Sequence, residues 1–462
     1  MLFPPTALER AMQIRDVLVR AMNKEYSWLR AAEILGLSRV TLRARSPEGT
    51  MVAYADGTPY KQLGTTCYVW THQPDALQQQ TLRTLAGSPF NKLRFCVFPK
   101  RYSWNTNEPP MYPFEGKPRN FDTTRFNPGF FQHFERRILD LQRLGIEADI
   151  ILLHPYDDGA WGFDRMTPSE DDRYLRYCIA RLSAFRNVWW SLANEYDFMT
   201  ERPAGHRGNK QWEDWDRFFE ILQQEDPHQR LRGIHNGRKW YDHTRDWVTH
   251  ASLQTSDMNG GMRFRAQYRK PVLYDECRYE GNIPQGWGNI DARTMTQRFW
   301  LGTMSGCYVG HGETYKHPED VLWWSKGGVL HGQSPKRIQW LKDFMAKAPP
   351  FHELEPLGDD KGRFVLAKPG EYYLVYCLHR KPETIQLAGQ RPYKIDMIDP
   401  WAMTVTPARA AKPRSVAEIV GRSREGRGTT RAVSSRYGMY IWSTNIWLLR
   451  SRIARDNATR QS

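Results

Sequence analysis

Short apolar runs alternate with amphipathic stretches between residues 61 and 345. The runs are typical of strands and the stretches of helices, and their alternation predicts βα units that form a parallel sheet. Strands are predicted at residues 62–67, 92–98, 147–153, 188–193, 231–234, 247–253, 272–274 and 307–309, and helices at 75–86, 128–144, 170–185, 211–225, 292–303 and 335–345. Eight strands are the number that closes a (β/α)₈ TIM barrel.

The pattern changes after Pro349 and Pro350. Short β-type runs at residues 364–367, 372–377, 385–388 and 393–398 predict a small antiparallel β-domain. We therefore expect an α/β protein in four parts: a helical segment at 1–47, the barrel at 48–349, the β-domain at 350–407 and a basic, poorly ordered tail at 408–462. A doubly wound sheet is the alternative, but no GxGxxG sequence opens a helix after the first strand.

The charge of the chain is concentrated at its two ends. Of a net charge of +15, residues 1–47 carry +4 and residues 408–462 carry +9, so the body carries only +2. A nearly neutral body disfavours nucleic acid as the main partner. Aromatic residues make up 13% of the chain and include 18 Trp, whose rings stack on sugars or on nucleobases.

Cysteine spacing and hydropathy narrow the class of protein further. The six cysteines are scattered and form no CxxC pair, a pattern that predicts neither a disulfide framework nor a zinc site. The N-terminal stretch carries charges where a signal peptide needs an apolar run, and no segment is long enough to span a membrane. We expect a cytoplasmic, soluble protein that works without a cofactor or a metal.

Two of the predicted strands end on carboxylates. The fourth leads into Asn194 and Glu195, and the seventh into Asp275 and Glu276. Catalytic groups of such barrels stand at the C-terminal ends of strands. A single glutamate there is more often a solvated loop residue or a salt-bridge partner, but two on nearly opposite strands supply the acid and the nucleophile that cleave a glycosidic bond. Their placement predicts a separation of about 5–5.5 Å and a retaining mechanism.

The sequences WSLANEYD and PVLYDECRYEG together resemble the fourth- and seventh-strand motifs of glycoside hydrolase clan A. Residues 52–407 further resemble an uncharacterised bacterial family of glycosidase-like barrels that continue into a small β-domain. The resemblance implies that Glu195 is the general acid/base and Glu276 the nucleophile. It also implies that Asn194 hydrogen-bonds a sugar 2-hydroxyl.

Other candidate site residues lie at further predicted strand ends. In clan members an Arg that ends the second strand commonly supports the nucleophile, and KLRFCVFP offers Arg94 in a similar place, although a structural ion pair is the alternative. The chain departs from the clan at Gln254, since members often carry a Tyr there. The remaining residues expected to bind the sugar are Trp70, His154, Tyr156, Trp161, His235, Asn236, Glu313 and Tyr315. Each of these His residues is as often a hydrogen-bonded packing residue, and Trp323 and Trp324 are expected to pack rather than to bind substrate.

The N-terminal segment holds a different signal. Its pattern predicts a helix at residues 9–22 and a helix-turn-helix at 27–45, in which Ser38 caps the second helix at 39–45. This segment resembles the DNA-binding start of insertion-sequence transposases. A working DNA reader usually needs dimer symmetry, so a solvated appendage that arose by gene fusion or a frame error is the simpler interpretation.

Taken as a whole, the chain is predicted to be a retaining glycoside hydrolase that cleaves a β-glycosidic bond with two glutamates, and its expected partner is a carbohydrate substrate. A barrel that binds carbohydrate without hydrolysing it is one alternative. A DNA-binding protein that acts through the N-terminal segment is the other.

Overall fold

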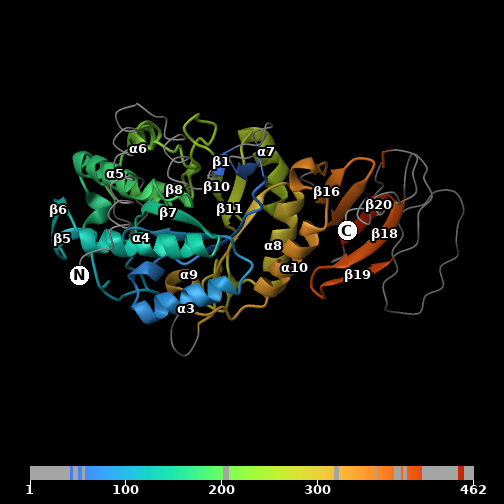
Figure 1. Ribbon diagram of the computed structural model, residues 1–462, viewed down its shortest axis with the longest axis horizontal. Coiled ribbons are helices and arrows are strands. Elements are labelled where there is room, and N and C mark those ends of the chain that lie inside the picture. Colours follow the sequence, from blue (N-terminus) through green and yellow to red (C-terminus); the bar gives the residue numbers. More distant parts are fainter. Residues whose placement is uncertain are drawn as a thin grey trace, which may run out of the picture.

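The computed structural model describes residues 42–44, 50–54, 58–200, 208–316, 322–358, 362–378, 387–388, 393–407 and 446–451. An eight-stranded parallel sheet is its main feature, and a six-stranded antiparallel sheet lies at the C-terminal end of the molecule (Figure 1). Helices α8 (Ala292–Met304) and α10 (Ser334–Ala346) lie between the two sheets (Figure 1). The predicted fold class, a (β/α)₈ barrel with a small antiparallel β-domain, is confirmed.

The barrel strands lie in the order β10, β11, β13, β3, β4, β7, β8, β9, and each neighbouring pair is parallel. They are β3 (Leu63–Thr66), β4 (Lys92–Cys96), β7 (Glu147–Leu153), β8 (Val188–Ala193), β9 (Arg232–Gly233), β10 (Ala251–Gln254), β11 (Val272–Glu276) and β13 (Tyr308–His311). An isolated parallel bridge from His235 to Ser252 spans the gap between β9 and β10. Because all pairs are parallel, the C-terminal ends of the strands share one side of the barrel.

The remaining barrel helices are α3 (Asp75–Ala86), α4 (Pro128–Arg143), α5 (Pro168–Leu182), α6 (Trp212–Glu225), α7 (Gly261–Tyr268) and α9 (Trp323–Lys326). Local chemistry sets where several of them begin. Asn127 accepts hydrogen bonds from the first backbone N–H groups of α4, and Asp291 does the same for α8. The sequence pattern does not predict α7, because its eight residues contain no long amphipathic stretch. Within the described part of the chain, no helix combines the length and apolar character that a membrane span needs.

Smaller elements decorate the rim of the barrel. A hairpin of β5 (Phe114–Lys117) and β6 (Asn120–Phe126) follows β4, and β12 (Glu280–Gly281) pairs in parallel with β14 (Glu313–Thr314) beyond the ends of β11 and β13. Short 3₁₀ turns lie at Trp70–His72, Phe163–Arg165, Tyr196–Met199, Met258–Gly260 and Phe351–Glu353. The β12/β14 pair and the turn after β8 extend the strand ends on which the predicted site residues lie.

The C-terminal sheet has the order β15, β16, β17, β20, β18, β19, and every pair is antiparallel. Its strands are β15 (Glu355–Pro356), β16 (Arg363–Lys368), β17 (Tyr372–Cys377), β18 (Tyr393–Asp399), β19 (Thr404–Pro407) and β20 (Ile446–Ser451). Leu366, Leu374 and Leu448 of this sheet share one buried cluster with Trp300 of α8. The domain is therefore attached to the barrel through apolar burial.

Two segments differ from the predictions. The strand β20 lies in the stretch expected to be a poorly ordered tail, yet it pairs on both sides, with β17 and β18, because Leu448 and Leu449 are buried in the two faces of the sheet. The strand β1 (Leu42–Ala44), expected to end the second N-terminal helix, pairs with β2 (Val52–Tyr54) instead, so hydrogen bonds to a neighbouring strand override its helical pattern. The rest of the predicted helix-turn-helix lies outside the described residues, as do residues 385 and 386 of the strand expected at 385–388, while 387 and 388 form no strand.

An ionic network fills part of the barrel interior. The Lys92 ammonium lies 2.5 Å from Asp149 Oδ2 and 2.7 Å from Asp275 Oδ1, and Ser252 donates to the other Asp275 oxygen at 2.5 Å. These side chains are at most 2% exposed. Burial raises the pKa of Asp149, whereas Lys92 and Arg94 overcome the effect of burial at Asp275 and hold its pKa well below the usual range. The network therefore joins β4, β7 and β11 through charge.

We expect Lys92→Met to destabilise the fold by about 3–5 kcal/mol, because the substitution removes the cation that lies between two buried carboxylates and leaves only the more distant Arg94 near them. Urea unfolding followed by circular dichroism measures the loss. The control is Lys117→Met at an exposed position of β5, for which a change within about 0.5 kcal/mol is expected. A loss below about 1 kcal/mol for Lys92→Met would show that the network does not hold these strands together.

Candidate active site

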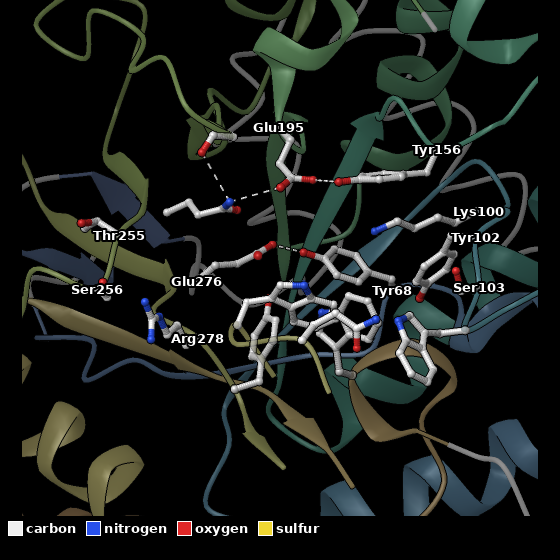
Figure 2. A pocket seen from close by; sticks show the side chains of 17 residues that line it. Tyr68, Lys100, Tyr102, Ser103, Tyr156, Glu195, Thr255, Ser256, Glu276 and Arg278 are labelled. Carbon is white, nitrogen blue, oxygen red and sulfur yellow. Dashed lines mark hydrogen bonds between the residues drawn. The ribbon is translucent and has the colours of Figure 1, made fainter. Parts of the chain in front are cut away.

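A pocket of about 570 Å³ opens at the C-terminal ends of the barrel strands (Figure 2). Residues at or just beyond the ends of β3, β8, β10 and β11 line it. The carboxyl groups of Glu195 and Glu276 both point into it (Figure 2). The full lining consists of Tyr68, Lys100, Tyr102, Ser103, Trp104, Tyr156, Glu195, Gly237, Gln254, Thr255, Ser256, Glu276, Arg278, Tyr279, Gln285, Trp287 and Trp324.

Glu195 follows β8 and is held by donors from three directions. Its backbone is left-handed, with φ of 48°, a strained conformation for a residue with a side chain. One carboxyl oxygen accepts hydrogen bonds from the Tyr156 hydroxyl and from Asn194 Nδ2, the latter at 3.2 Å. The other accepts from Gln254 Nε2 at 3.1 Å. These contacts fix the carboxyl group at the edge of the pocket.

The surroundings of Glu195 change its acidity. Burial raises the pKa of this carboxyl to about 7, and the nearby Glu276 carboxylate adds to the rise. The Lys100 ammonium and the hydrogen bonds from Tyr156 and Gln254 oppose it. In neutral solution, a large share of Glu195 therefore carries a proton that it can donate.

Glu276 ends β11 and has different partners. Its side chain is 12% exposed, and its Oε1 accepts a hydrogen bond from the Tyr68 hydroxyl and lies 3.3 Å from Arg94 Nη1. The same Arg94 nitrogen donates to Asn194 Oδ1 at 2.8 Å. Since a guanidinium is always charged, Glu276 has a permanent cation beside it. Arg94 thus connects the residue before Glu195 to Glu276.

Aromatic side chains form one wall of the pocket. The rings of Trp287 and Trp324 lie 5.0 Å apart, at 46° to each other, and Trp324 also contacts Tyr102 and Tyr279. Trp287 is 36% exposed, and Trp104 lines the pocket beside this group. Rings at the rim of a polar pocket suit the apolar faces of a sugar.

The structure brings five of the predicted site residues together. Tyr156, Glu195 and Glu276 line the pocket, while Arg94 and Asn194 lie beneath it and contact the two glutamates. Arg94 also retains the alternative structural interpretation, since its Nε lies 4.0 Å from a carboxylate of the interior network. Arg94 therefore contacts both the glutamate site and the ionic network of the barrel interior.

Three residues expected to bind sugar lie in other contacts. Trp70 is fully buried in the hydrophobic core. Both ring nitrogens of His154 lie within hydrogen-bond distance of backbone atoms, and the indole N–H of Trp161 donates to Glu108 at 3.1 Å. Strand-end position correctly predicts the side of the barrel, but it does not predict whether a side chain points toward the pocket.

Four more expected sugar-binding residues also lie outside the lining. His235 is fully buried 3.9 Å from Glu276, and burial lowers its pKa well below the usual range, so its ring is neutral. Asn236 forms two hydrogen bonds with the backbone of Gln254, at 3.0 and 3.2 Å. Glu313 accepts from the backbone of a neighbouring loop, and burial raises its pKa to about 8. The Tyr315 hydroxyl donates to the buried carboxyl of Glu280 at 3.1 Å.

Several lining residues are missed by the sequence analysis. Trp324, which was expected to pack, lines the pocket. Trp323 is buried, and its indole N–H donates to the Thr65 hydroxyl of β3 at 2.9 Å. Tyr68 lies two residues beyond β3, so the strand-end rule could have found it. Lys100 lies in a loop beyond β4, where no periodic pattern applies.

Comparison with known proteins places these features in a family. A family model described as the apiosidase-like catalytic domain matches residues 46–349. A candidate glycoside hydrolase from Bacteroides vulgatus, known from a crystal structure, is 34% identical, with a TM-score of 0.76 over 90% of this chain and 83% of its own. A glycoside hydrolase family 5 protein from the same species is 17% identical, with a TM-score of 0.64 over 90% and 94%, a likeness of fold. No curated protein matches the chain.

The environment of Glu195 predicts a dependence of stability on pH. The unfolded chain releases the Glu195 proton near its ordinary pKa of 4.5, but the folded protein keeps it until about pH 7. The stability that this proton contributes is therefore present below about pH 4.5 and lost as the pH rises to 7. The amide of Glu195→Gln stays neutral at every pH. When the pH rises from 4.5 to 8, the free energy of unfolding of this variant should therefore fall by about 1–3 kcal/mol less than that of the wild type.

Urea unfolding at several pH values measures this difference. The matched control is Glu220→Gln on the exposed side of α6, which should follow the wild-type dependence. Parallel pH curves for the wild type and Glu195→Gln would contradict the account of a carboxyl held neutral by burial.

Proposed function

The chain belongs to the family of apiosidase-like catalytic domains and is a glycoside hydrolase, and we propose that it cleaves β-glycosidic bonds with retention through a covalent intermediate. The observation that carries the proposal is the contrast between two carboxyl groups in one pocket. Burial gives Glu195 a pKa of about 7, whereas Glu276 has the permanent charge of Arg94 at 3.3 Å. Such a contrast supports an acid and a nucleophile.

In the first step, Glu276 attacks the anomeric carbon while Glu195 gives its proton to the leaving oxygen. The glycosidic bond breaks as an ester between the sugar and Glu276 forms. In the second step, ionised Glu195 takes a proton from water, whose oxygen attacks the anomeric carbon. The ester breaks, and both glutamates return to their starting states.

The neighbours of the glutamates have separate tasks in this mechanism. The Tyr68 hydroxyl and Arg94 hold Glu276 on the side from which it attacks. Tyr156, Asn194 and the Gln254 amide hold Glu195. Contact between Asn194 and a sugar 2-hydroxyl stays a prediction, since its amide nitrogen lies 3.2 Å from Glu195.

The substrate is a carbohydrate, and the family name makes aryl β-apiosides the first compounds to test in a panel of 4-nitrophenyl β-glycosides and plant oligosaccharides. The wall that includes Trp287 and Trp324 supports a sugar as the group that the pocket binds. A barrel that only binds carbohydrate is disfavoured, because both glutamates face the same pocket (Figure 2).

Substitution of Glu276 and substitution of Glu195 should have different effects on activity. Glu276→Ala cannot form the ester, so activity on every substrate of the panel should be lost. Glu195→Ala should still cleave substrates with activated leaving groups, which depart without a proton, and its ester should then hydrolyse slowly. Added azide attacks without the help of a base and should restore turnover to give a β-glycosyl azide.

Steady-state kinetics and product analysis by NMR measure these effects. Glu108→Ala, an exposed glutamate at the same rim outside the pocket, serves as the control and should keep wild-type rates. If azide instead restores turnover of Glu276→Ala and gives a β-glycosyl azide, Glu276 is the acid/base and Glu195 the nucleophile. Wild-type protein that releases no sugar from any member of the panel would overturn the proposal.

A further inference from the structure

Lys100 is the most unusual residue of the pocket. Its side chain reaches from the loop after β4 toward the space between Tyr156 and Tyr68 (Figure 2). Its Nζ lies 3.7 Å from the centre of the Tyr68 ring and 4.0 Å from that of Tyr156, with Tyr102 at 4.8 Å and Trp324 at 5.5 Å. The residue is only 2% exposed. An aromatic cage therefore surrounds this ammonium group at the pocket wall.

The ammonium group of Lys100 forms no hydrogen bond or ion pair with the part of the chain that the structure describes. The other three buried lysines of that part, Lys92, Lys210 and Lys270, each donate to two oxygen atoms of the protein. An ammonium group has three N–H donors, and aromatic faces accept none of them as well as oxygen does. The donors of Lys100 thus remain available to a molecule in the pocket.

The position of Lys100 relates it to both glutamates. Tyr68, whose ring lies under the ammonium, donates to Glu276, and Tyr156, on its other side, donates to Glu195. A sugar ring placed between the two glutamates therefore presents one edge to Lys100. Gln254 contacts Glu195 from another strand, β10.

We propose that Lys100 is a substrate-binding residue, whose ammonium group donates hydrogen bonds to hydroxyl oxygens of the sugar between Glu195 and Glu276. This inference rests on the proposed function and deepens it, because it makes the pocket specific for a sugar with hydroxyl groups on the Lys100 side. The hydroxyl oxygens of the bound sugar then accept the hydrogen bonds for which the described protein atoms offer Lys100 no acceptor.

The position of Glu276 beside Lys100 favours a sugar hydroxyl over a sugar carboxylate as the acceptor at this ammonium group, although the pocket as a whole also contains Arg278 in its lining and Arg94 beneath it. A sugar carboxylate at Lys100 would add a further negative charge close to Glu276 in a poorly hydrated site, where like charges repel strongly. Sugar hydroxyl groups satisfy the ammonium donors without that repulsion.

The test uses Lys100→Met, which keeps the length and apolar stem of the side chain but removes the charge and the donors. The probe is the 4-nitrophenyl β-glycoside of the panel with the highest wild-type kcat/KM, together with its monodeoxy forms. We expect kcat/KM on the parent glycoside to fall about ten- to a hundredfold, the range for a hydrogen bond to a charged group. The control is Lys326→Met in α9, two residues beyond Trp324, which should keep wild-type kinetics.

The monodeoxy forms separate direct contact from a structural effect. Loss of the hydroxyl that contacts Lys100 should cost the wild type about the same factor as Lys100→Met, and should cost the variant little more. If every monodeoxy form loses the same factor in the wild type and in the variant, Lys100 does not contact a hydroxyl and the proposal is wrong. A matching glycuronide that the wild type prefers and Lys100→Met does not would also overturn it, in favour of carboxylate binding.

The pH profile gives a second readout that a purely structural role would not move. The charged and titratable groups that face Lys100 are Glu195, Glu276, Arg94, the Cys96 thiol and the neutral imidazole of His154, besides the tyrosines of the cage. Removal of the ammonium withdraws a positive charge that lowers the pKa of Glu195. The basic limb of kcat/KM should therefore move to higher pH in Lys100→Met and return toward the wild-type position in Lys100→Arg.

Failure of the proposed function gives a different result from failure of this inference. If the wild type hydrolyses nothing, the proposed function fails, and calorimetric titration of the wild type and Lys100→Met with the methyl β-glycosides of the same panel tests Lys100 alone. Binding at least tenfold weaker in the variant supports the inference. Equal affinities, or no binding to either protein, overturn it.

Discussion

The buried guanidinium of Arg94 is the constraint on which the pocket depends. A cation that is 1% exposed needs oxygen partners, and Arg94 finds them in Asn194 and Glu276, at 2.8 and 3.3 Å. Burial alone would lower the pKa of this guanidinium, but Tyr68 and the surrounding carboxylates raise it above its usual range. Because these partners lie at the ends of β8 and β11, the ends of two nearly opposite strands are held in one arrangement. The Lys92 network beneath it joins β4, β7 and β11 in the barrel interior.

The same arrangement divides the two glutamates. Glu276 shares an oxygen with a permanent cation, whereas Glu195 is held by neutral donors and, through burial, keeps its proton to about pH 7. Two identical side chains thus differ in the groups that surround their carboxyl oxygens, because they lie at the ends of different strands. The left-handed backbone of Glu195 is a local cost that the surrounding contacts offset.

Much of the barrel could be predicted from the sequence, because long periodic runs determine their own structure. The predicted bounds of β7, β8 and α3 agree with the structure, whereas β9 and β10 are shorter than expected and are connected by a single bridge between His235 and Ser252. The two glutamates were predicted because they end strands. Lys100 and Trp324 were not, because they reach the pocket from a loop and from the four-residue helix α9, whose positions depend on packing across the rim. Besides Arg94 and Asn194, which lie beneath the pocket, seven predicted site residues lie outside its lining, because a strand end fixes the position of a residue but not the direction of its side chain.

The central claim is that Glu276 forms a covalent bond to the sugar. A 2-deoxy-2-fluoro β-glycoside with a good leaving group slows the second step more than the first and allows the ester to accumulate. Mass spectrometry of the treated protein, followed by peptide mapping, locates it. The account predicts one sugar per chain, on the peptide that contains Glu276. A label on Glu195, or no label on an enzyme that hydrolyses the parent glycoside, would contradict it.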